Sequence, residues 1–354
     1  MKILMLVNWK IEYCNEAPCD KQPPDYYLKD GSPYWFFRYF KERPEVDVID
    51  ISSFKWLENF EKNKLRFYVI QSLKAIPKLN KYDLILSHGM QSGVVVSLWR
   101  KFFNIKAKHI VFDIGSFNSA AESGKALKLM QYASKSIDGI IYHTSSQIEY
   151  YKKFFPWIVD KSKFIRFGTD FEFFDNDLEN LRQTDEDYII CVGYSKRDWD
   201  TLVSAYRNLN TKVKMKMIGH KDEKYNDVEG LEQLSFIPIK ELIQEINNSR
   251  FCVLPLESFN YSFGQMTLMQ QMALGKCVIA ADVPSLRDYI EDGKTAVLYQ
   301  AKNVQDLQLK LEKLIDNEDL AKEIGKRGRE FILEECNEIT MALEIESFLK
   351  ERSC

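Results

Sequence analysis

The sequence lacks the cysteine and histidine patterns of a metal site or a disulfide framework. Seven cysteines are scattered over 354 residues without a Cys-x-x-Cys pair, and the chain has only four histidines. The closest cysteines, Cys14 and Cys19, have no companion pair. An odd number of scattered cysteines is typical of a reducing compartment. We therefore expect no metal site and a cytoplasmic protein.

Long apolar runs and a strong net charge are also missing. The first apolar run, residues 1–7, is only one strand long, and no run approaches the roughly 18 apolar residues of a membrane span. A net charge of −3 provides no bulk attraction to nucleic acid, so we expect no nucleic-acid partner. With 45% hydrophobic residues, the chain can form two domains of ordinary size.

A βαβ pattern in the second half organises the analysis. An apolar strand at 251–254 precedes a loop that ends at Gly264, and a run of good helix formers follows up to Gly275. The next apolar run, 278–281, predicts another strand. Free N–H groups at the start of such a helix favour an anion such as a phosphate. The pattern indicates a phosphate-binding loop, although an ordinary α/β crossover shares it.

This segment and its continuation, residues 264–298, resemble the donor-binding segment of family-4 retaining glycosyltransferases of the GT-B fold. The family's Glu-x7-Glu pair is absent, because alignment on the Met-Ala-Leu-Gly run at 272–275 places Ser262 and Gln270 at those positions. The chain therefore resembles a divergent branch of the family.

The alternation of strands and helices in each half predicts an α/β protein with two doubly wound, Rossmann-like domains. By the resemblance these domains face a cleft in the GT-B manner. We expect an acceptor-side domain at 1–178 and a nucleotide-sugar-binding domain at 184–335. A helix at 336–354 is expected to cross back to the first domain.

The segment after the strand at 188–192 predicts the diphosphate site. The family has an Arg directly after the Gly and a nearby Lys; here Tyr194 replaces the first and Arg197 aligns with the second. The alternative for Arg197 is a surface ion pair with Asp198 or Asp200. The resemblance and the position of the loops together give these candidate donor-binding residues: Gly31, Gly193, Tyr194, Lys196, Arg197, Gly219, Phe236, Ile237, Ser262, Gly264, Gln265, Met266 and Gln270.

Candidate catalytic residues are Arg197, which would stabilise the leaving diphosphate, and His88 and Asp113, which would contact the acceptor. His88 and Asp113 come at the ends of predicted strands, where ligands of α/β proteins bind. A structural role for either residue remains open. We expect the acceptor around Gly31, His88 and Asp113.

Two stretches, 55–78 and 99–108, interleave basic and aromatic residues. Such stretches are either solvated helix faces or a patch that touches anionic lipid. The second interpretation places the protein peripherally on the cytoplasmic face of a membrane.

The resemblance implies a retaining, metal-independent transferase of the hexosyltransferase type. Its donor would be a nucleotide-diphosphate sugar, with no other cofactor, and its acceptor a sugar or a lipid-linked sugar in polysaccharide or glycolipid assembly. A nucleotide-sugar-binding protein without catalysis and a sugar epimerase of GT-B architecture are the alternatives.

Overall fold

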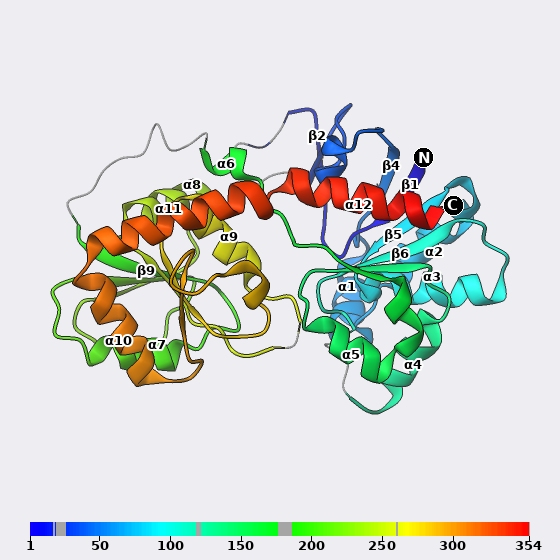
Figure 1. Ribbon diagram of the computed structural model, residues 1–354. Coiled ribbons are helices and arrows are strands. Elements are labelled where there is room, and N and C mark those ends of the chain that lie inside the picture. Colours follow the sequence, from blue (N-terminus) through cyan, green and yellow to red (C-terminus); the bar gives the residue numbers. More distant parts are fainter. Residues whose placement is uncertain (17, 19–25, 118–121, 176–185, 260, 354) are drawn as a thin grey trace. The chain divides into compact units, whose positions relative to one another are not determined.

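A computed structural model describes residues 1–16, 18, 26–117, 122–175, 186–259 and 261–353 (Figure 1). The chain forms two compact units. The first contains Met1–Arg166, Asn260–Ser262 and Ile339–Cys354, and the second contains Phe167–Phe259 and Phe263–Glu338. The domain boundary expected at 179–183 lies outside the described residues.

The described part of the first unit contains a six-stranded parallel sheet with the order β4-β1-β5-β6-β7-β8. Its central strands are continuous apolar runs, as expected for parallel strands covered on both faces. The register pairs Ile3 of β1 with Val46 of β4 and Leu84 of β5. The strands are β1 (Lys2–Leu6), β4 (Glu45–Ile49), β5 (Leu84–His88), β6 (Lys108–Asp113), β7 (Gly139–Tyr142) and β8 (Ser162–Phe164).

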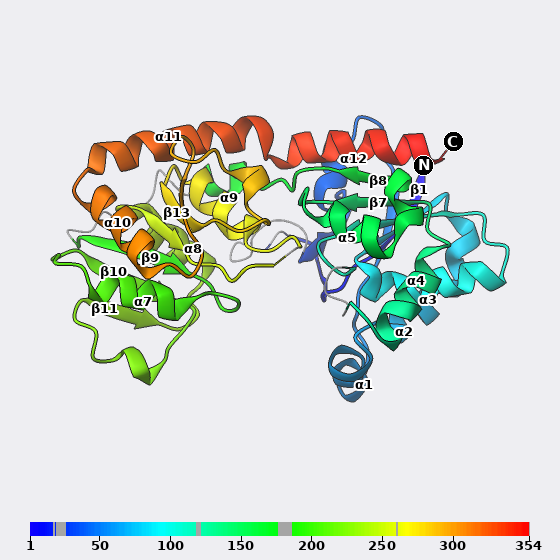
Figure 2. The ribbon, with the colours of Figure 1, turned by 60° about the horizontal axis from the view of Figure 1, so that its bottom comes forward.

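Helices cover this sheet, and the last helix of the chain packs with the same unit (Figures 1 and 2). The buried carboxylate of Glu346 on that helix accepts hydrogen bonds from the backbone N–H groups of Lys41 and Glu42. The longer helices are α1 (Lys55–Phe60), α2 (Val69–Ala75), α3 (Met90–Phe102), α4 (Lys125–Ser134), α5 (Gln147–Phe154) and α12 (Glu338–Ser353); the shorter ones are η1 (Trp35–Tyr39), η2 (Glu61–Leu65), η3 (Ile76–Lys81) and η4 (Pro156–Lys161).

The described part of the segment between β1 and β4 contains regular structure of its own. It contains a two-stranded parallel sheet of β2 (Glu12–Cys14) and β3 (Tyr27–Lys29). The 3₁₀ helix η1 follows, preceded by Tyr34 in an extended conformation. Its aromatic residues are held by tertiary burial, which a local capping pattern does not reveal.

The second unit repeats the architecture with a described six-stranded parallel sheet of order β11-β10-β9-β12-β13-β14. Its strands are β9 (Tyr188–Val192), β10 (Lys214–Ile218), β11 (Leu231–Leu234), β12 (Cys252–Leu254), β13 (Val278–Ala281) and β14 (Val297–Tyr299). Its helices are α6 (Phe171–Asp175), α7 (Trp199–Arg207), α8 (Ile239–Asn248), α9 (Gln265–Ala273), α10 (Val304–Ile315) and α11 (Glu318–Glu335), with the short η6 (Glu223–Tyr225) and η7 (Arg287–Tyr289). Each sheet thus presents its carboxyl edge, where the βα loops gather, as the place for a ligand.

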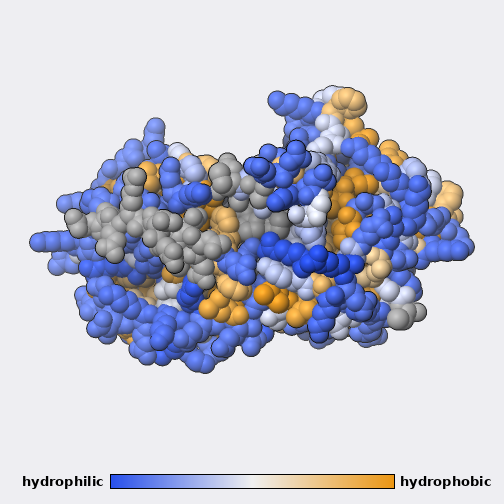
Figure 3. All heavy atoms as spheres, turned by 90° about the horizontal axis from the view of Figure 1, so that it is seen from above, coloured by the Kyte–Doolittle hydropathy of each residue, from blue (hydrophilic) through white to orange (hydrophobic). Residues whose placement is uncertain are grey.

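Each sheet and its helices enclose apolar cores. The face drawn in Figure 3 is mainly hydrophilic, with apolar residues in small groups between charged ones. The buried strands and the inner faces of the helices form these cores together.

Close packing of α11 on the backbone beside β13 depends on Gly325. A Cβ atom at this position would overlap the Gly275 carbonyl and the Cys277 backbone nitrogen. We predict that Gly325→Ala lowers the free energy of opening of the second unit by about 1–3 kcal/mol, the usual cost of overpacking. Hydrogen exchange of β12 and β13 amides measures this. The exposed neighbour Lys326→Ala is the control, and equal protection in both variants would contradict the prediction.

Candidate functional site

The candidate donor site lies at the carboxyl edge of the second sheet, in the loops after β9, β10, β11 and β12. The loop after β12 ends at Gly264, which precedes α9 with a φ of 87° in the left-handed region. A side chain there would also overlap Leu256, so only glycine suits this position. The helix begins at Gln265, as the sequence predicted. Its first N–H groups thus open at the strand edge.

Arg197 connects two of these loops. Its Nε donates to the Val192 carbonyl at 3.1 Å, one terminal nitrogen donates to the Ser195 carbonyl at 3.2 Å, and the other to Thr267 Oγ1 at 3.1 Å. Thr267 lies in the first turn of α9. The guanidinium also packs directly on Gly193, where a Cβ atom would overlap it. These contacts fix a cation beside the start of a helix.

The charge of Arg197 is buried without an opposite charge. The side chain is only 8% exposed, and no carboxylate of a described residue forms an ion pair with it. Burial lowers the pKa of its guanidinium, although arginine stays charged at neutral pH. Three of its five N–H groups are used, so two remain for a ligand. A buried cation in this state is costly unless an anion can reach it.

The surface alternative for Arg197 is wrong, because both neighbouring acids have other partners. Asp198 caps α7 through the Thr201 backbone N–H at 3.2 Å and the Thr201 hydroxyl at 2.7 Å. Asp200 pairs with Lys224 at 2.9 Å and accepts from the Tyr225 hydroxyl at 2.8 Å.

Two exposed aromatic rings stand together at the same edge. Tyr194 follows β9, Phe236 follows β11, and their ring centroids are 5.6 Å apart. They are 52% and 72% exposed, which is unusual for rings that contact each other. Gly219, at the end of β10, packs against the Gly193 carbonyl and the Tyr194 ring. The arrangement offers a flat apolar surface to a planar ligand.

Lys196 lies between this surface and the loop after β12. Its ammonium is 4.3 Å from the Phe259 ring centroid and 4.8 Å from that of Phe263, within cation–π range. The remaining predicted donor residues divide between the units. Ile237, Gly264, Gln265, Met266 and Gln270 belong to the second unit, whereas Ser262 belongs to the first.

His88 is a neutral member of an aromatic cluster in the first unit. Its ring centroid is 4.4 Å from that of Trp9 and 5.2 Å from that of Phe112, and the residue is 4% exposed. Burial, reinforced by His143, lowers the pKa of His88 to about 3. Its Nδ1 has no hydrogen-bond partner among the described residues. The geometry favours a structural role for His88 over a contact with the acceptor.

Asp113 organises a turn and is fully buried. One carboxylate oxygen accepts from the backbone N–H groups of Gly115 and Ser116 and from the Ser116 hydroxyl, and the other accepts from Tyr151 at 2.6 Å. Burial raises the pKa of Asp113. An acceptor hydroxyl finds no exposed oxygen here, so the structural role predicted as the alternative fits Asp113.

Gly31 also departs from the expected position. It is exposed and follows β3 of the two-stranded sheet rather than a strand of the main sheet. The three residues expected around the acceptor are therefore two buried groups and one exposed turn, and none of them presents a polar side chain to a ligand.

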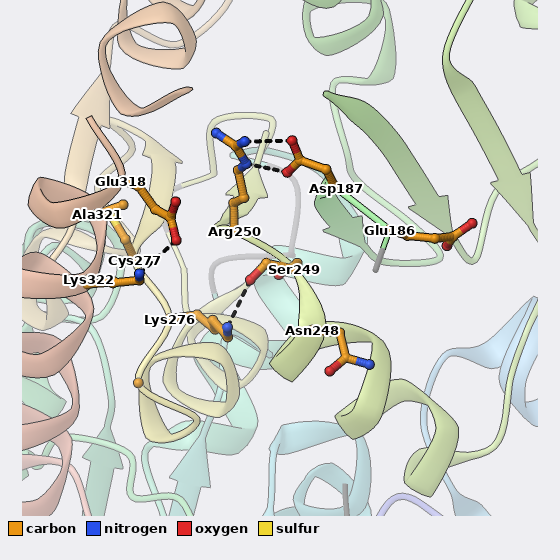
Figure 4. Close-up of a pocket in the computed structure, with 11 residues that line it drawn as sticks. Glu186, Asp187, Asn248, Ser249, Arg250, Lys276, Cys277, Glu318, Ala321 and Lys322 are labelled. Atoms are coloured by element: carbon orange, nitrogen blue, oxygen red, sulfur yellow. Dashed lines mark hydrogen bonds and ion pairs between the residues drawn. The ribbon is translucent and has the colours of Figure 1, made fainter. Parts of the chain in front are cut away.

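A pocket of about 330 Å³ lies at the opposite, amino edge of the second sheet (Figure 4). Its charges satisfy one another: Arg250 pairs with Asp187, and Lys322 pairs with Glu318 at 2.7 Å. Lys276 donates to the Ser249 carbonyl at 2.8 Å, and burial lowers the pKa of its ammonium. This edge lacks the βα loops, so we do not assign the substrate to it.

Residue analysis of the sequence missed Thr267, which holds Arg197, and the Phe259–Lys196–Phe263 contact. The interleaved aromatic residues of the loop at 257–263 were a signal for the latter. Thr267 carried no signal of its own, because a threonine in a helix is most often a surface residue.

The second unit is similar in sequence to known glycosyltransferases. Residues 173–331 match the sequence model of the family described as glycosyl transferases group 1. This match covers most of the second unit. An uncharacterized glycosyltransferase of Methanocaldococcus jannaschii is 30% identical over 140 residues, which cover 37% of this chain and 38% of that protein. The chain thus matches well under half the length of this curated relative.

Solved structures show the same fold over nearly the whole chain. Sucrose-phosphate synthase of Thermosynechococcus elongatus superposes with a TM-score of 0.70 at 17% identity, covering 99% of each chain. HepE of Anabaena in complex with UDP superposes with a TM-score of 0.71 at 14% identity, covering 99% of this chain and 100% of that one. The chain therefore has two α/β units with parallel sheets, matching GT-B glycosyltransferase structures as predicted.

The described residues contain no group of three or more His, Cys, Asp or Glu side chains that could hold a metal. No helix among the described residues is long and apolar enough to cross a membrane.

The neutral His88 makes stability depend on pH. The unfolded chain takes up this proton near pH 6.5, whereas the folded chain resists it down to about pH 3, so the unfolded state binds more protons between these values. This contribution to stability is complete above pH 6.5 and is lost as the pH falls. We predict that His88→Phe makes the dependence of unfolding free energy on pH shallower by about 1.4 kcal/mol per pH unit between about pH 6 and 4.

Urea unfolding followed by tryptophan fluorescence measures this slope, since all of the six tryptophans except Trp199 belong to the first unit. Carboxylates titrate in both proteins, so the difference between the slopes isolates His88. Identical slopes would show that folded His88 is protonated in this range.

Proposed function

We propose that the protein transfers a sugar from a nucleotide-diphosphate sugar to an acceptor. One observation carries the proposal: the buried Arg197 guanidinium meets the first turn of α9 at the carboxyl edge of a group 1 glycosyltransferase domain. A fixed cation and free helix N–H groups together favour a diphosphate.

In this proposal the diphosphate binds between the two open N–H groups of Arg197 and the N-terminus of α9 at Gly264 and Gln265. The glycosidic C–O bond to the diphosphate breaks and its electron pair goes to the diphosphate oxygen. The acceptor hydroxyl oxygen bonds to the sugar carbon, and its proton passes to the leaving diphosphate. Arg197 and the helix N–H groups stabilise the charge that develops on the leaving diphosphate. The positive charge then comes from the chain rather than from a metal ion.

The exposed pair of Tyr194 and Phe236 suits the nucleotide base, with backbone groups near Ile237 for its edge. HepE structures contain UDP and UDP-glucose, which supports uridine diphosphate as the first nucleotide to test. Transfer with retention, a hexosyl donor and a place in polysaccharide or glycolipid assembly follow from the family resemblance. A cytoplasmic location, at a membrane surface for a lipid-linked acceptor, completes the proposal.

The strongest test replaces the buried cation. Arg197→Ala should weaken UDP binding by about 1.5–3 kcal/mol, the range for hydrogen bonds to charged groups. Isothermal titration calorimetry measures this. Arg207→Ala is the matched control, since Arg207 lies on α7 of the same unit and only pairs with Asp227 at the surface. An unchanged dissociation constant in Arg197→Ala, with the fold intact by circular dichroism, would remove Arg197 from the site.

Gln270 stands where the family has its second glutamate, and we propose that it contacts the ribose. Its amide can both donate to and accept from a diol. Gln270→Glu should preserve or improve transfer, and Gln270→Leu should reduce it. Equal rates for the three proteins would place Gln270 outside the site.

The absence of both glutamates also supports the alternative function, a nucleotide-sugar-binding protein without catalysis, since Ser262 and Gln270 carry no charge. Slow hydrolysis of a labelled nucleotide sugar distinguishes a transferase from a binder. Interconversion at a sugar carbon without transfer would indicate an epimerase.

A further inference from the structure

The first unit contains a pocket of about 710 Å³ that none of the predicted acceptor residues lines. It opens at the carboxyl edge of the first sheet, where Gln91 follows β5 and Ser116 follows β6. Ligands of parallel α/β sheets bind at this edge. The pocket is therefore in the right place for a substrate, although its residues are not those that the sequence suggested.

The rim of the pocket is cationic. Four basic side chains line it, and no described lining residue is acidic: Lys62, Lys64, Arg66 and Lys125. All four are exposed, and none forms an ion pair with a described residue. Such a group of unpaired cations around one hollow attracts an anion, and arginine and lysine are the side chains that bind phosphate best.

The inner wall is apolar. Val94 of α3 is buried, and Leu65, Leu129 and Met130 are half-buried beside it. Inorganic phosphate and sugar phosphates have no hydrocarbon group that could pack against this wall. A ligand that carries both a phosphate and a hydrocarbon group fits both halves of the pocket.

Hydrogen bonds from several elements hold the pocket in shape. The buried Glu61 carboxylate accepts from the backbone N–H groups of Val69 and Ile70 at 2.8 and 2.9 Å, which fixes the turn that bears the basic residues. The Tyr68 N–H donates to the Gln91 carbonyl at 2.9 Å and joins this turn to α3. On the opposite side, the Met90 N–H donates to the Ser116 hydroxyl at 2.8 Å.

A helix with exposed aromatic residues leads directly into the basic rim. Phe54 and Trp56 are 75% and 70% exposed, Phe60 is 47% exposed, and α1 has no buried residue. Figure 2 shows α1 standing away from the sheet of the first unit. A helix of this kind, with lysines at its end, is suited to lie in the interface of an anionic bilayer.

We propose that this pocket binds a phosphate-bearing membrane lipid. The lipid phosphate lies at the basic rim and the hydrocarbon chain lies along the apolar wall that contains Val94 and Met130, while α1 lies in the bilayer surface. The lipid then serves as the acceptor of the sugar, either through its phosphate or through a group attached to that phosphate. This role of the lipid rests on the proposed function. The acceptor then has a site on the first unit without any role for His88 or Asp113.

The binding test uses geranyl phosphate as the probe, with geraniol and inorganic phosphate as its two halves, by isothermal titration calorimetry. The rim variant Lys62→Gln, Lys64→Gln, Arg66→Gln should bind geranyl phosphate at least about tenfold more weakly than the unmodified protein. The control Lys78→Gln, Lys81→Gln, Lys106→Gln makes the same charge change near the amino edge of the sheet, at exposed lysines, and should bind it unchanged.

Each outcome decides the proposal. Tight binding of geranyl phosphate, weak binding of both halves and loss in the rim variant alone support it. An equal loss of geranyl phosphate affinity in the rim and control variants would overturn the proposal. If inorganic phosphate bound as tightly as geranyl phosphate, the pocket would be assigned to a soluble phosphate and the proposal would also be overturned. UDP titration of the rim variant separates the two sites, because the Arg197 site should be unaffected. If UDP fails to bind any of these proteins while the geranyl phosphate result holds, the donor proposal falls and the lipid pocket stands.

The membrane part is tested by co-sedimentation with vesicles of phosphatidylglycerol and, separately, of phosphatidylcholine. Binding to the anionic vesicles should exceed binding to the neutral ones and decrease with salt, as charge screening requires. Phe54→Ser with Trp56→Ser should reduce binding several-fold. Tyr13→Ser with Tyr132→Ser, which removes two exposed rings of the same unit outside both basic-aromatic stretches, should leave it unchanged. Equal binding of the two double variants would overturn the role of α1.

Discussion

A buried guanidinium that no described carboxylate neutralises is the interaction on which the second unit's site depends. Arg197 is held by two carbonyl oxygens and one hydroxyl, which align it but leave its net charge uncompensated. The arrangement requires Gly193, because any Cβ atom there would displace the guanidinium, and it requires the loop after β12 to lie close to the loop after β9. Folding thus maintains a charge whose cost falls only when an anion binds.

Most of the fold could be predicted because parallel strands buried on both faces are continuous apolar runs. The strands β9 and β13 have the predicted bounds, since each run ends abruptly at Gly or at a polar residue. The region between β1 and β4 could not be predicted in this way. Its pairing of β2 with β3 joins residues distant in the sequence, and its aromatic helix η1 is stabilised by tertiary burial rather than by a local pattern.

The candidate site could be predicted only in part. A polar residue at the end of a buried strand is the signal for both a ligand contact and a turn-organising group. Arg197 fits the first, because its partners are neutral and two of its N–H groups stay open. Asp113 fits the second, because Tyr151 on α5 and the Ser116 turn donate hydrogen bonds to its two carboxylate oxygens. Only the long-range partners distinguish these cases, and the sequence does not contain them.

Cations without an ion-pair partner point to anion-binding sites in this protein, because basic residues do not outnumber acidic ones. It contains 52 acidic and 49 basic residues, so partners for every lysine and arginine are available in the composition. At the amino edge of the second sheet such partners are used, in the pairs of Arg250 with Asp187 and Lys322 with Glu318. At the carboxyl edges, the buried Arg197 and the basic rim of the first unit's pocket form no ion pair with a described residue. An isolated surface lysine without a partner is ordinary, but a buried cation and a ring of cations around an apolar hollow are not. The proposed donor and lipid sites both place a negative charge at such a cation.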